Sequence, residues 1–302
     1  MRRTRTYLLR GSALLLLAAV VVVGLVSRAR AHELVTNPYS TRKMPDKTPA
    51  DFGMPFEEVR VKTTDGFALV GWQVPSVNGA TLILVHGYKD SRAIMLRVAQ
   101  LFHRHGYGLL ILSVRAHDRS DGELITFGHL EMRDLDAWYT FEEQQPGINL
   151  TEVGLFGVSM GGSLGLQYAA QNPGIASVVT DSAFSSLEDT ISTSVKFFTG
   201  LPPFPFAPMI QFWTEREAGF DIGEINARRW IGQIAPRPVF ILQGDADVVV
   251  SHQSGERLYE AAGNPKEFWH EADTGHAQFL DKHPAEFEQR VVGFFDRTLH
   301  VQ

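Results

Sequence analysis

The sequence predicts an α/β protein whose sheet is mostly parallel and is covered by helices on both faces. Three observations predict this class. From Phe56 onward, short apolar runs of strand length alternate with segments of helical periodicity. One of these runs, 153–156, leads directly into a helix through a glycine-flanked serine. The chain has 302 residues, 44% of them hydrophobic and 21% charged, which is enough for a sizeable core.

The first 31 residues differ from the rest. Four arginines precede an apolar run from Ala13 to Val26, so we expect this segment to enter a membrane. The uncharged stretch 11–27 is just long enough to span a bilayer, and the preceding arginines favour a cytoplasmic N-terminus. We expect a single-pass signal anchor in the cell membrane, with the rest of the chain outside the cytoplasm. The alternative is a signal peptide cleaved near Ala31, which would give a secreted or periplasmic protein.

Charge and cysteine content limit the possible partners. Six of the 28 basic residues lie in residues 1–31, which hold no acid, so the remainder carries 22 basic against 34 acidic groups, a net charge of −12. Such a domain has no electrostatic reason to bind nucleic acid or an anionic lipid surface. The chain has no cysteine, which excludes disulfides, thiol catalysis and cysteine metal sites.

Residues 32–55 contain four prolines and predict a linker lying over a folded domain that spans 56–302. A hairpin turn signal at 64–66, with apolar positions on either side, predicts two strands. Two continuous apolar runs, 80–85 and 107–114, have the pattern of buried parallel strands, and an amphipathic helix separates them.

Strand and helix then alternate to the end of the chain. The expected strands are 153–156, 176–180, 239–243 and 266–270, and the expected helices are 130–145, 162–171, 254–262 and 284–299.

More than fifty residues separate the strand ending near Thr180 from the next strand. Because unstructured loops of that length are uncommon, we expect a small cap over about 183–232, folded onto the carboxyl edge of the sheet. The aromatic residues of this interval are Phe197, Phe198, Phe204, Phe206, Phe212, Trp213 and Phe220. They either form an apolar wall for substrate or simply attach a two-helix insertion to the body.

The G-x-S-x-G motif at 157–161 is expected to be a nucleophile elbow. A strand that passes directly into a helix requires a tight turn, so Ser159 at its apex takes a strained backbone conformation. The flanking glycines allow the two backbones to approach each other. The serine hydroxyl should therefore be presented at the carboxyl edge of the sheet as a nucleophile.

A nucleophilic serine needs a base, and the base needs an orienting carboxylate. Asp247 follows the strand 239–243, and His276 follows the next strand, so both lie at the edge that presents Ser159. We expect His276 to take the serine proton and Asp247 to hold the imidazole tautomer. Asp181, at the end of its own strand, is the main alternative for the acid, and Asp245 is a weaker one.

Val85-His86-Gly87-Tyr88 ends an earlier strand, and Gly87 allows the chain to turn there. We expect the backbone N–H groups of Tyr88 and Met160 to form an oxyanion hole facing the serine. His86 is expected to be structural and to hold this turn.

These motifs together resemble the α/β-hydrolase superfamily over roughly residues 56–299. The resemblance rests on HGY at 86–88, GVSMG at 157–161, GDADVVV at 244–250 and TGH at 274–276. It implies the α/β-hydrolase fold and a Ser-Asp-His triad but not a substrate, because this fold hosts esterases, lipases, thioesterases, peptidases and lactonases.

Within the superfamily, the chain looks like the membrane-tethered or exported bacterial hydrolases often labelled serine aminopeptidase-like. Its RAHDRSDG at 115–122 is similar to the R-G-H-G-x-S-x-G loop of that branch. Ala116 and Asp118 stand where that pattern has glycines, and we therefore expect a less tightly turned loop.

The expected function is hydrolysis of an uncharged small-molecule ester with a short to medium acyl group. An aminopeptidase-like enzyme is an alternative, since Glu215, Glu217 or Asp221 near the cap could bind a substrate ammonium group. The alternative outside the enzymes is a protein that binds a ligand in the same pocket and does not catalyse a reaction.

No cofactor and no metal are expected. The sequence contains no phosphate loop, nicotinamide fingerprint or metal motif. His103 and His105, two residues apart on a helix, point to different faces, and His117 and His129 have no acid at ligand spacing.

Overall fold

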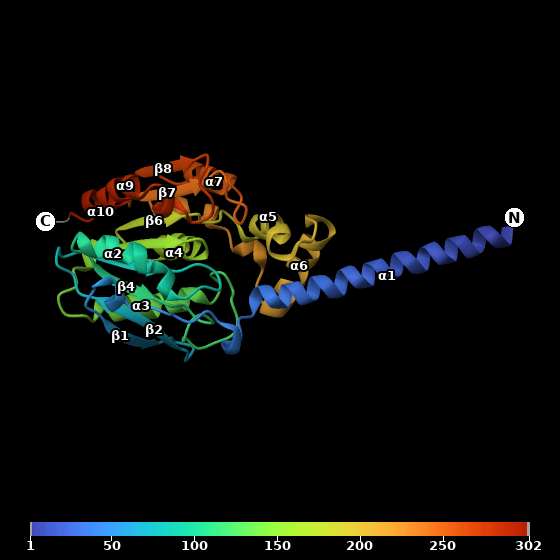
Figure 1. The fold of residues 1–302 in the computed structure, drawn as a ribbon, viewed down its shortest axis with the longest axis horizontal. Helices are drawn as coiled ribbons and strands as arrows, with labels where there is room; N and C mark the ends of the chain where they lie inside the picture. Colours follow the sequence, from blue (N-terminus) through green and yellow to red (C-terminus); the bar gives the residue numbers. More distant parts are fainter. Residues whose placement is uncertain (1, 301–302) are drawn as a thin grey trace.

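The computed structural model describes residues 2–300, with side chains from Arg10 onward. At its centre is an eight-stranded sheet with the order β1-β2-β4-β3-β5-β6-β7-β8 (Figure 1). β2 pairs antiparallel with β1 and with β4, and all other neighbours are parallel, so the predicted mostly parallel sheet is confirmed. The strands are β1 (Glu57–Lys62), β2 (Ala68–Val74), β3 (Thr81–Val85), β4 (Gly108–Leu112), β5 (Val153–Val158), β6 (Ser177–Asp181), β7 (Val239–Gly244) and β8 (Lys266–Glu271).

Helices cover both faces of this sheet, as predicted. Successive residues of a strand face opposite sides, so Leu82 and Leu84 of β3 join the core beneath α2, α8, α9 and α10. Ile83 and Val85 join the core beneath α3 and α4. The helices are α1 (Arg2–Val35), α2 (Leu96–Arg104), α3 (Glu131–Glu143), α4 (Met160–Gln171), α5 (Leu187–Thr199), α6 (Pro203–Ala218), α7 (Gln253–Ala261), α8 (Phe279–Lys282), α9 (Pro284–Phe287) and α10 (Gly293–Thr298).

The predicted boundaries agree closely with the structure. Each of the apolar runs predicted as a buried strand, from 80–85 to 266–270, is a strand whose ends lie within two residues of the prediction. The helix expected over 284–299 is present as α9 and α10 joined by a π-helical turn, Glu288–Val292.

The cap region over 183–232 contains α5, α6 and three short 3-10 turns. α5 ends at Gly200 and α6 ends at Gly219, and both glycines adopt the left-handed conformation that commonly ends a helix. Figure 1 shows α5 and α6 at the end of the domain from which α1 extends, with α6 beside α1.

The structure shows no break at residue 31, where we expected the anchor to end and the linker to begin, since α1 continues to Val35. Ala31 and Val35 are fully buried, so this end of the helix belongs to the packed domain. The segment that follows α1 contacts the domain. The buried Arg42 ties it down by donating to the backbone oxygens of Asn37 and Ser120.

One described helix is long and apolar enough to cross a membrane: the part of α1 from Arg10 to Val35, with a mean hydropathy of 2.3 over its most apolar window. Its leucines and valines between residues 14 and 25 are largely exposed, unlike those of a buried core helix.

Candidate active site

Ser159 stands alone between β5 and α4, with φ +55° and ψ −120°. This is the strained elbow that the sequence predicts, and both flanking glycines are required by close contacts. A Cβ at Gly157 would lie 2.4 Å from the Gly161 oxygen, and a Cβ at Gly161 would lie 2.2 Å from the Val85 oxygen. The elbow is further held by the Ser159 amide, which donates to the Asp181 oxygen at 2.8 Å.

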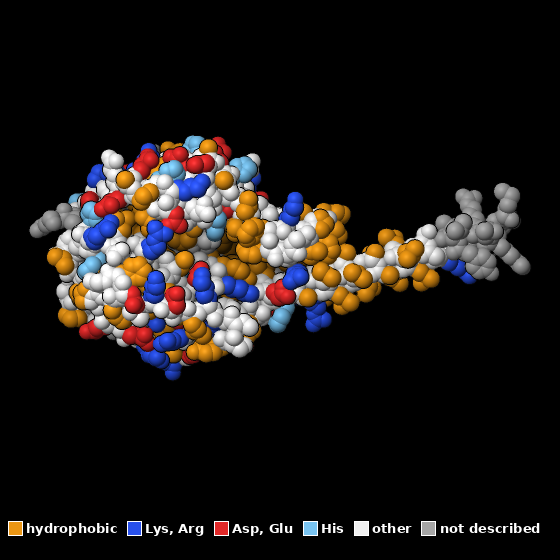
Figure 2. All heavy atoms as spheres, in the orientation of Figure 1, with side chains coloured by type: hydrophobic (Ala, Val, Ile, Leu, Met, Phe, Trp, Pro, Cys, Tyr) orange, Lys and Arg blue, Asp and Glu red, His pale blue; other side chains and the backbone are white. Residues whose placement is uncertain are grey.

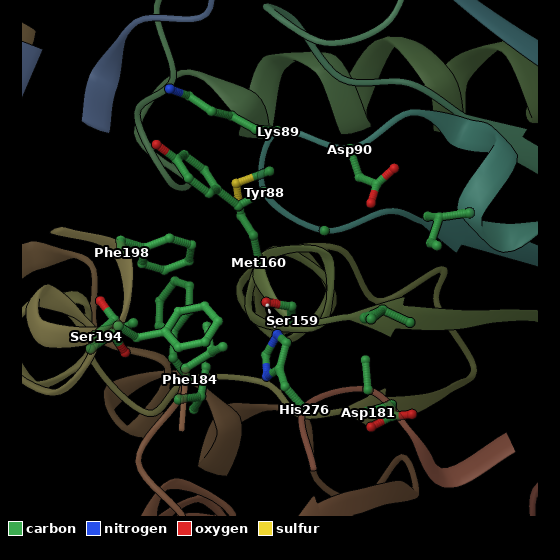
Figure 3. A pocket seen from close by; sticks show the side chains of 18 of the residues that line it. Tyr88, Lys89, Asp90, Ser159, Met160, Asp181, Phe184, Ser194, Phe198 and His276 are labelled. Atoms are coloured by element: carbon green, nitrogen blue, oxygen red, sulfur yellow. Dashed lines mark hydrogen bonds between the residues drawn. The ribbon is translucent and has the colours of Figure 1, made fainter. Parts of the chain in front are cut away.

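Ser159, His276 and Asp247 form a continuous chain of hydrogen bonds. The serine Oγ lies 2.9 Å from His276 Nε2 (Figure 3). On the other side of the imidazole, His276 Nδ1 lies 2.7 Å from Asp247 Oδ2. Asp247 is buried, and its other oxygen accepts from the amides of Val249 and Val250 at 2.8 and 2.9 Å. This arrangement aims the free lone pair of Nε2 at the serine hydroxyl.

The two alternative acids do not reach His276. Asp181 is buried and turns away from the imidazole (Figure 3), and burial raises its pKa to about 7. It accepts from the Ser182 hydroxyl at 3.0 Å, and that hydroxyl in turn accepts from the Ala277 amide at 2.9 Å. Asp181 thus supports the loop that carries His276. Asp245 lies on the surface, 3.9 Å from His270.

The turn expected to supply the oxyanion hole packs directly against the elbow. A Cβ at Gly87 would lie 3.5 Å from Ser159 Cβ, so the two segments are in contact. Met160 is the first residue of α4, where an N–H has no partner inside the helix. The Met160 N–H therefore lies free of the helix directly after the serine, and the turn that carries Tyr88 packs against the same elbow.

Two buried histidines hold this turn. His86 Nδ1 donates to the Gly87 oxygen at 2.8 Å, which agrees with the structural role expected for it. His117 Nδ1 donates to the Arg115 oxygen at 2.7 Å, which leaves Nε2 free to accept from the Lys89 amide at 3.0 Å. Burial lowers the pKa of both histidines, so both remain neutral. From the sequence we considered His117 only as a poor metal ligand, because no local pattern indicates this positioning role.

The 115–122 loop turns tightly although it lacks the two glycines of the pattern that it resembles, which differs from our expectation. Ala116 and Asp118 both adopt left-handed conformations, with φ of +59° and +52°. Asp tolerates this region better than most residues. The Asp118 carboxylate also lies 3.1 Å from the buried Arg92 guanidinium, which compensates part of the cost of burying it.

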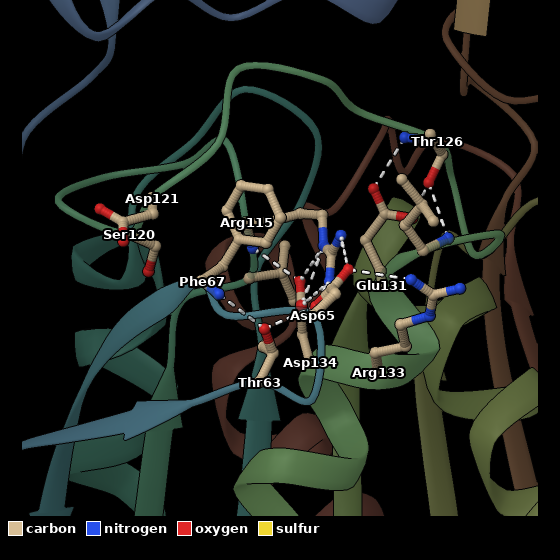
Figure 4. Close-up of polar contacts among 12 residues, drawn as sticks. Thr63, Asp65, Phe67, Arg115, Ser120, Asp121, Thr126, Glu131, Arg133 and Asp134 are labelled. Carbon is tan, nitrogen blue, oxygen red and sulfur yellow. Dashed lines mark hydrogen bonds and ion pairs between the residues drawn. The ribbon is translucent and has the colours of Figure 1, made fainter. Parts of the chain in front are cut away.

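The same loop is anchored by a buried ion-pair network (Figure 4). Arg115 is 2% exposed and donates to Asp134 on α3 at 2.7 Å and to Asp65 in the β1–β2 hairpin at 2.9 Å. Although partial burial raises the pKa of Asp65, hydrogen bonds from Arg115, Thr63 and Arg133 outweigh it and lower that pKa below its ordinary value. The network thus connects the β1–β2 hairpin and α3 to the loop that contains His117.

Ser159 and His276 lie in a cleft of about 800 Å³ between the cap and the body. Most of the lining is apolar. From the cap come Phe184, Leu187, Ile191, Val195, Phe197, Phe198 and Ile210, and from the body Tyr88, Met95, Val98, Phe127, Phe156, Val158, Leu280 and Phe287.

The aromatic residues of the cap do not form one wall. Of the seven named from the sequence, Phe197 and Phe198 line the cleft. Phe220 is buried and stacks on His129, whereas Phe204 and Phe212 are exposed. Both interpretations of this segment therefore hold for part of it.

The three acids considered for an ammonium site lie outside the cleft, which corrects that expectation. Glu217 contacts His32, Glu215 accepts from the Ile222 amide, and Asp221 accepts from the Gly223 amide. The carboxylates that do line the cleft are Glu33, Asp90, Asp181 and Asp281. Three of them already pair with cations: Arg30 with Glu33, Lys43 with Asp90, and Arg97 with Asp281.

Among the residues whose side chains are described, no group of three His, Asp or Glu side chains is arranged to hold a metal ion. His105 contacts Glu288 on the surface, and His129 stacks on Phe220.

The fold and this site define an α/β hydrolase, and comparison with known proteins agrees. The family model for the alpha/beta hydrolase fold matches residues 80–229. The structure of the Pyrococcus furiosus esterase Pf2001 superposes with a TM-score of 0.75 at 27% identity, covering 88% of this chain and 98% of that one. YqkD of Bacillus subtilis (strain 168) is 25% identical over 234 residues, 76% of each chain. YfhR of Escherichia coli (strain K12) is 25% identical over 256 residues, 82% of each chain. The chain belongs to the α/β-hydrolase superfamily, and it is a hydrolase of that family.

Proposed function

We propose that this protein is a serine hydrolase that cleaves uncharged carboxylic esters with short to medium acyl groups through an acyl-enzyme intermediate. The observation that carries the proposal is the unbroken hydrogen-bond chain from Ser159 through His276 to Asp247 on the floor of an apolar cleft. Nucleophile, base and orienting acid are all present, which favours an enzyme over a binding protein on the same fold.

In the first half of the reaction, Ser159 Oγ attacks the ester carbonyl carbon as His276 Nε2 takes the serine proton. The negative charge that develops on the carbonyl oxygen is stabilised by the N–H groups of Tyr88 and Met160. The C–O bond to the alcohol then breaks, and the alcohol leaves with the proton from His276.

In the second half, water attacks the acyl-serine carbonyl while His276 accepts a proton from it. The carboxylic acid leaves, and the proton returns to Ser159 Oγ. Asp247 keeps Nδ1 protonated throughout and stabilises the imidazolium that forms in each half.

The preference for an uncharged ester follows from the lining of the cleft. Aliphatic and aromatic side chains favour an apolar acyl or alcohol group at about 25 cal/mol per Å² of buried surface. A substrate with a free N-terminus would need an unpaired carboxylate, but three of the four carboxylates in the cleft pair with cations. The fourth, Asp181, has a raised pKa and accepts from Ser182. The esterase activity of the P. furiosus relative supports the same choice.

We also propose that α1 is retained as a membrane anchor with the domain outside the cytoplasm. The possible signal-peptidase site, Ala29-Arg30-Ala31, lies inside an unbroken helix. Its last residue, Ala31, is fully buried against the domain. N-terminal sequencing of protein from the native host tests this, since a mature start at His32 would mean cleavage and release.

The activity test uses a fluorophosphonate probe together with p-nitrophenyl esters from acetyl to palmitoyl and aminoacyl p-nitroanilides. We expect labelling of the native protein, no labelling of Ser159→Ala, and the highest kcat/KM on esters from acetyl to octanoyl. Labelling that persists in Ser159→Ala would refute the nucleophile. Faster turnover of the anilides would make the protein a peptidase.

A further inference from the structure

The cap carries exposed aromatic side chains on its outer surface. Phe204 is 81% exposed, Phe197 and Phe198 are each 56% exposed, and Phe212 is 39% exposed. We call these four residues the cap aromatic face. Figure 2 shows hydrophobic side chains gathered over the cap, next to the point where α1 leaves the domain. Large exposed apolar groups gathered in this way mark a surface that contacts another apolar phase or a partner.

The position of α1 indicates that the apolar phase beside the cap is a membrane. Within the apolar run 13–26, Leu14 to Leu17 are 60–74% exposed, as on the surface of a helix that faces lipid. Burial begins before the run ends: Val23, Gly24 and Val26 are half-buried, and Ser27 is fully buried. α6 provides this cover, and Arg28 lies over the Trp213 ring at 5.4 Å. The cap therefore packs beside the last turn of the segment that crosses the membrane.

The apolar stretch of α1 is too short to hold the cap away from the bilayer surface. Residues 11–27 form a helix about 25 Å long, whereas the hydrocarbon core of a bilayer is about 30 Å thick. The end of this stretch, around Ser27, must therefore lie at the membrane interface, and α6 lies there with it. In Figure 1 the cap is the part of the domain that reaches furthest along α1 toward its N-terminus. Interfaces of this kind are where aromatic side chains concentrate in membrane proteins.

The cleft opens on the same part of the molecule. Phe197 and Phe198 belong both to the exposed cap aromatic face and to the lining of the cleft. Arg30, Glu33 and Leu34, from the last turns of α1, line the cleft as well. The cleft thus joins the membrane-facing side of the cap to Ser159, with an apolar wall at Phe197 and Phe198.

We propose that the cap aromatic face rests in the outer leaflet of the membrane that holds α1, and that the substrate is an uncharged ester dissolved in that leaflet. The ester passes Phe197 and Phe198 to reach Ser159. Because the domain outside the anchor carries a net charge of −12, apolar contact rather than attraction to anionic headgroups holds the face in the leaflet. The part of this proposal that concerns the substrate rests on the function proposed above.

The absence of native cysteine makes the position of the face directly measurable. A Phe204→Cys variant of the full chain is labelled with an environment-sensitive fluorophore and reconstituted into phosphatidylcholine bilayers. Val77→Cys is the matched control, because Val77 is 83% exposed and lies between β2 and β3, at the sheet edge opposite the cleft. We expect nitroxide-labelled lipids to quench the label in Phe204→Cys strongly and the label in Val77→Cys weakly. Equal, weak quenching of the two labels would overturn the proposed orientation.

The substrate is tested with Phe204→Ser and Val77→Ser, since neither residue lines the cleft. Release of octanoate from dioctanoylglycerol in phosphatidylcholine bilayers is compared with hydrolysis of p-nitrophenyl butyrate in water. We expect Phe204→Ser to lower the first rate about tenfold, as expected for loss of one buried Phe side chain, and to leave the second unchanged. Val77→Ser should change neither rate.

A Phe204→Ser variant that cleaves dioctanoylglycerol as fast as the native protein would overturn the leaflet route. If the native protein cleaves neither ester while the label in Phe204→Cys is still quenched, the proposed function fails and the membrane-facing surface stands. The labelling experiment needs no catalysis, so the two failures are distinguishable.

Discussion

Replacing Asp247 with Asn gives the sharpest test of the proposed triad. The Asp247 Oδ1 atom accepts from the amides of Val249 and Val250, so the oxygen of an Asn side chain should occupy that position. The NH₂ group then takes the place of Oδ2, the atom that lies 2.7 Å from His276 Nδ1 in the native protein. Because this NH₂ group can only donate to His276 Nδ1, it favours the imidazole tautomer in which Nδ1 is unprotonated and Nε2 carries the proton. His276 would then donate to Ser159 and could not take its proton.

We expect Asp247→Asn to lower kcat by about 10⁴, which corresponds to about 5.5 kcal/mol of activation free energy. The Asn side chain has nearly the same volume as Asp247 and keeps most of its hydrogen bonds, so the free energy of unfolding should change little. Steady-state hydrolysis of p-nitrophenyl butyrate gives the rate, and urea unfolding gives the stability.

Asp181→Asn is the matched control, because Asp181 contacts Ser182 and not His276. The Asn oxygen can still accept from the Ser182 hydroxyl, so the support of the Ala277 amide is retained. We expect the rate to stay within about threefold of the native value, as for a change outside the reacting groups. A large rate loss in Asp181→Asn together with a mild effect in Asp247→Asn would refute the assignment of the acid.

Three further predictions concern the groups around the site. Because burial raises the pKa of Asp181 to about 7, the folded state binds its proton more tightly than the unfolded state does. Stability should therefore fall as pH rises from about 4 through 7. Asp181→Asn should flatten this decline in urea unfolding measured at several pH values, and an unchanged slope would contradict it. Asp134→Ala leaves the Arg115 guanidinium without its main buried partner and should cost about 3–5 kcal/mol in the same assay, whereas a loss below 1 kcal/mol would show that Arg115 is compensated elsewhere. His117→Phe removes the acceptor for the Lys89 amide and should lower kcat at least about tenfold with KM little changed, because the turn contributes to the transition state rather than to binding. Partial recovery in His117→Gln would support positioning, and equal loss of stability and activity in both variants would refute it.

Local patterns determined much of this protein in advance. The order of strands and helices follows from hydrophobic periodicity, since a buried strand and an amphipathic helix each need their own spacing of apolar side chains. The elbow at Ser159 was predictable for a similar reason: a strand that passes directly into a helix between two glycines has few conformations available. The positions of Asp247 and His276 follow from a topological rule, because the carboxyl ends of parallel strands meet at one edge.

Other features were decided only by the tertiary structure. Asp181 ends β6, and Asp247 lies in the loop after β7 at the same edge of the sheet. Which of the two meets His276 depends on the path of each loop. His117 lies 28 residues from Lys89 in the sequence, and no local pattern connects them. Glu215, Glu217 and Asp221 follow the aromatic segment closely but lie outside the cleft. Each has a partner elsewhere: Glu217 contacts His32, and the other two accept from backbone amides in the turn after α6.

The end of α1 shows the same division. Its apolar run and basic flank predict a membrane helix, since both are properties of composition. Composition does not reveal that the helix continues past residue 31, nor that its last turns line the cleft beside Ser159. That depends on the contact between α1 and α6, which lie nearly 170 residues apart in the sequence. Short-range spacing can specify an element and its buried face, but the partner of that face is decided by long-range packing.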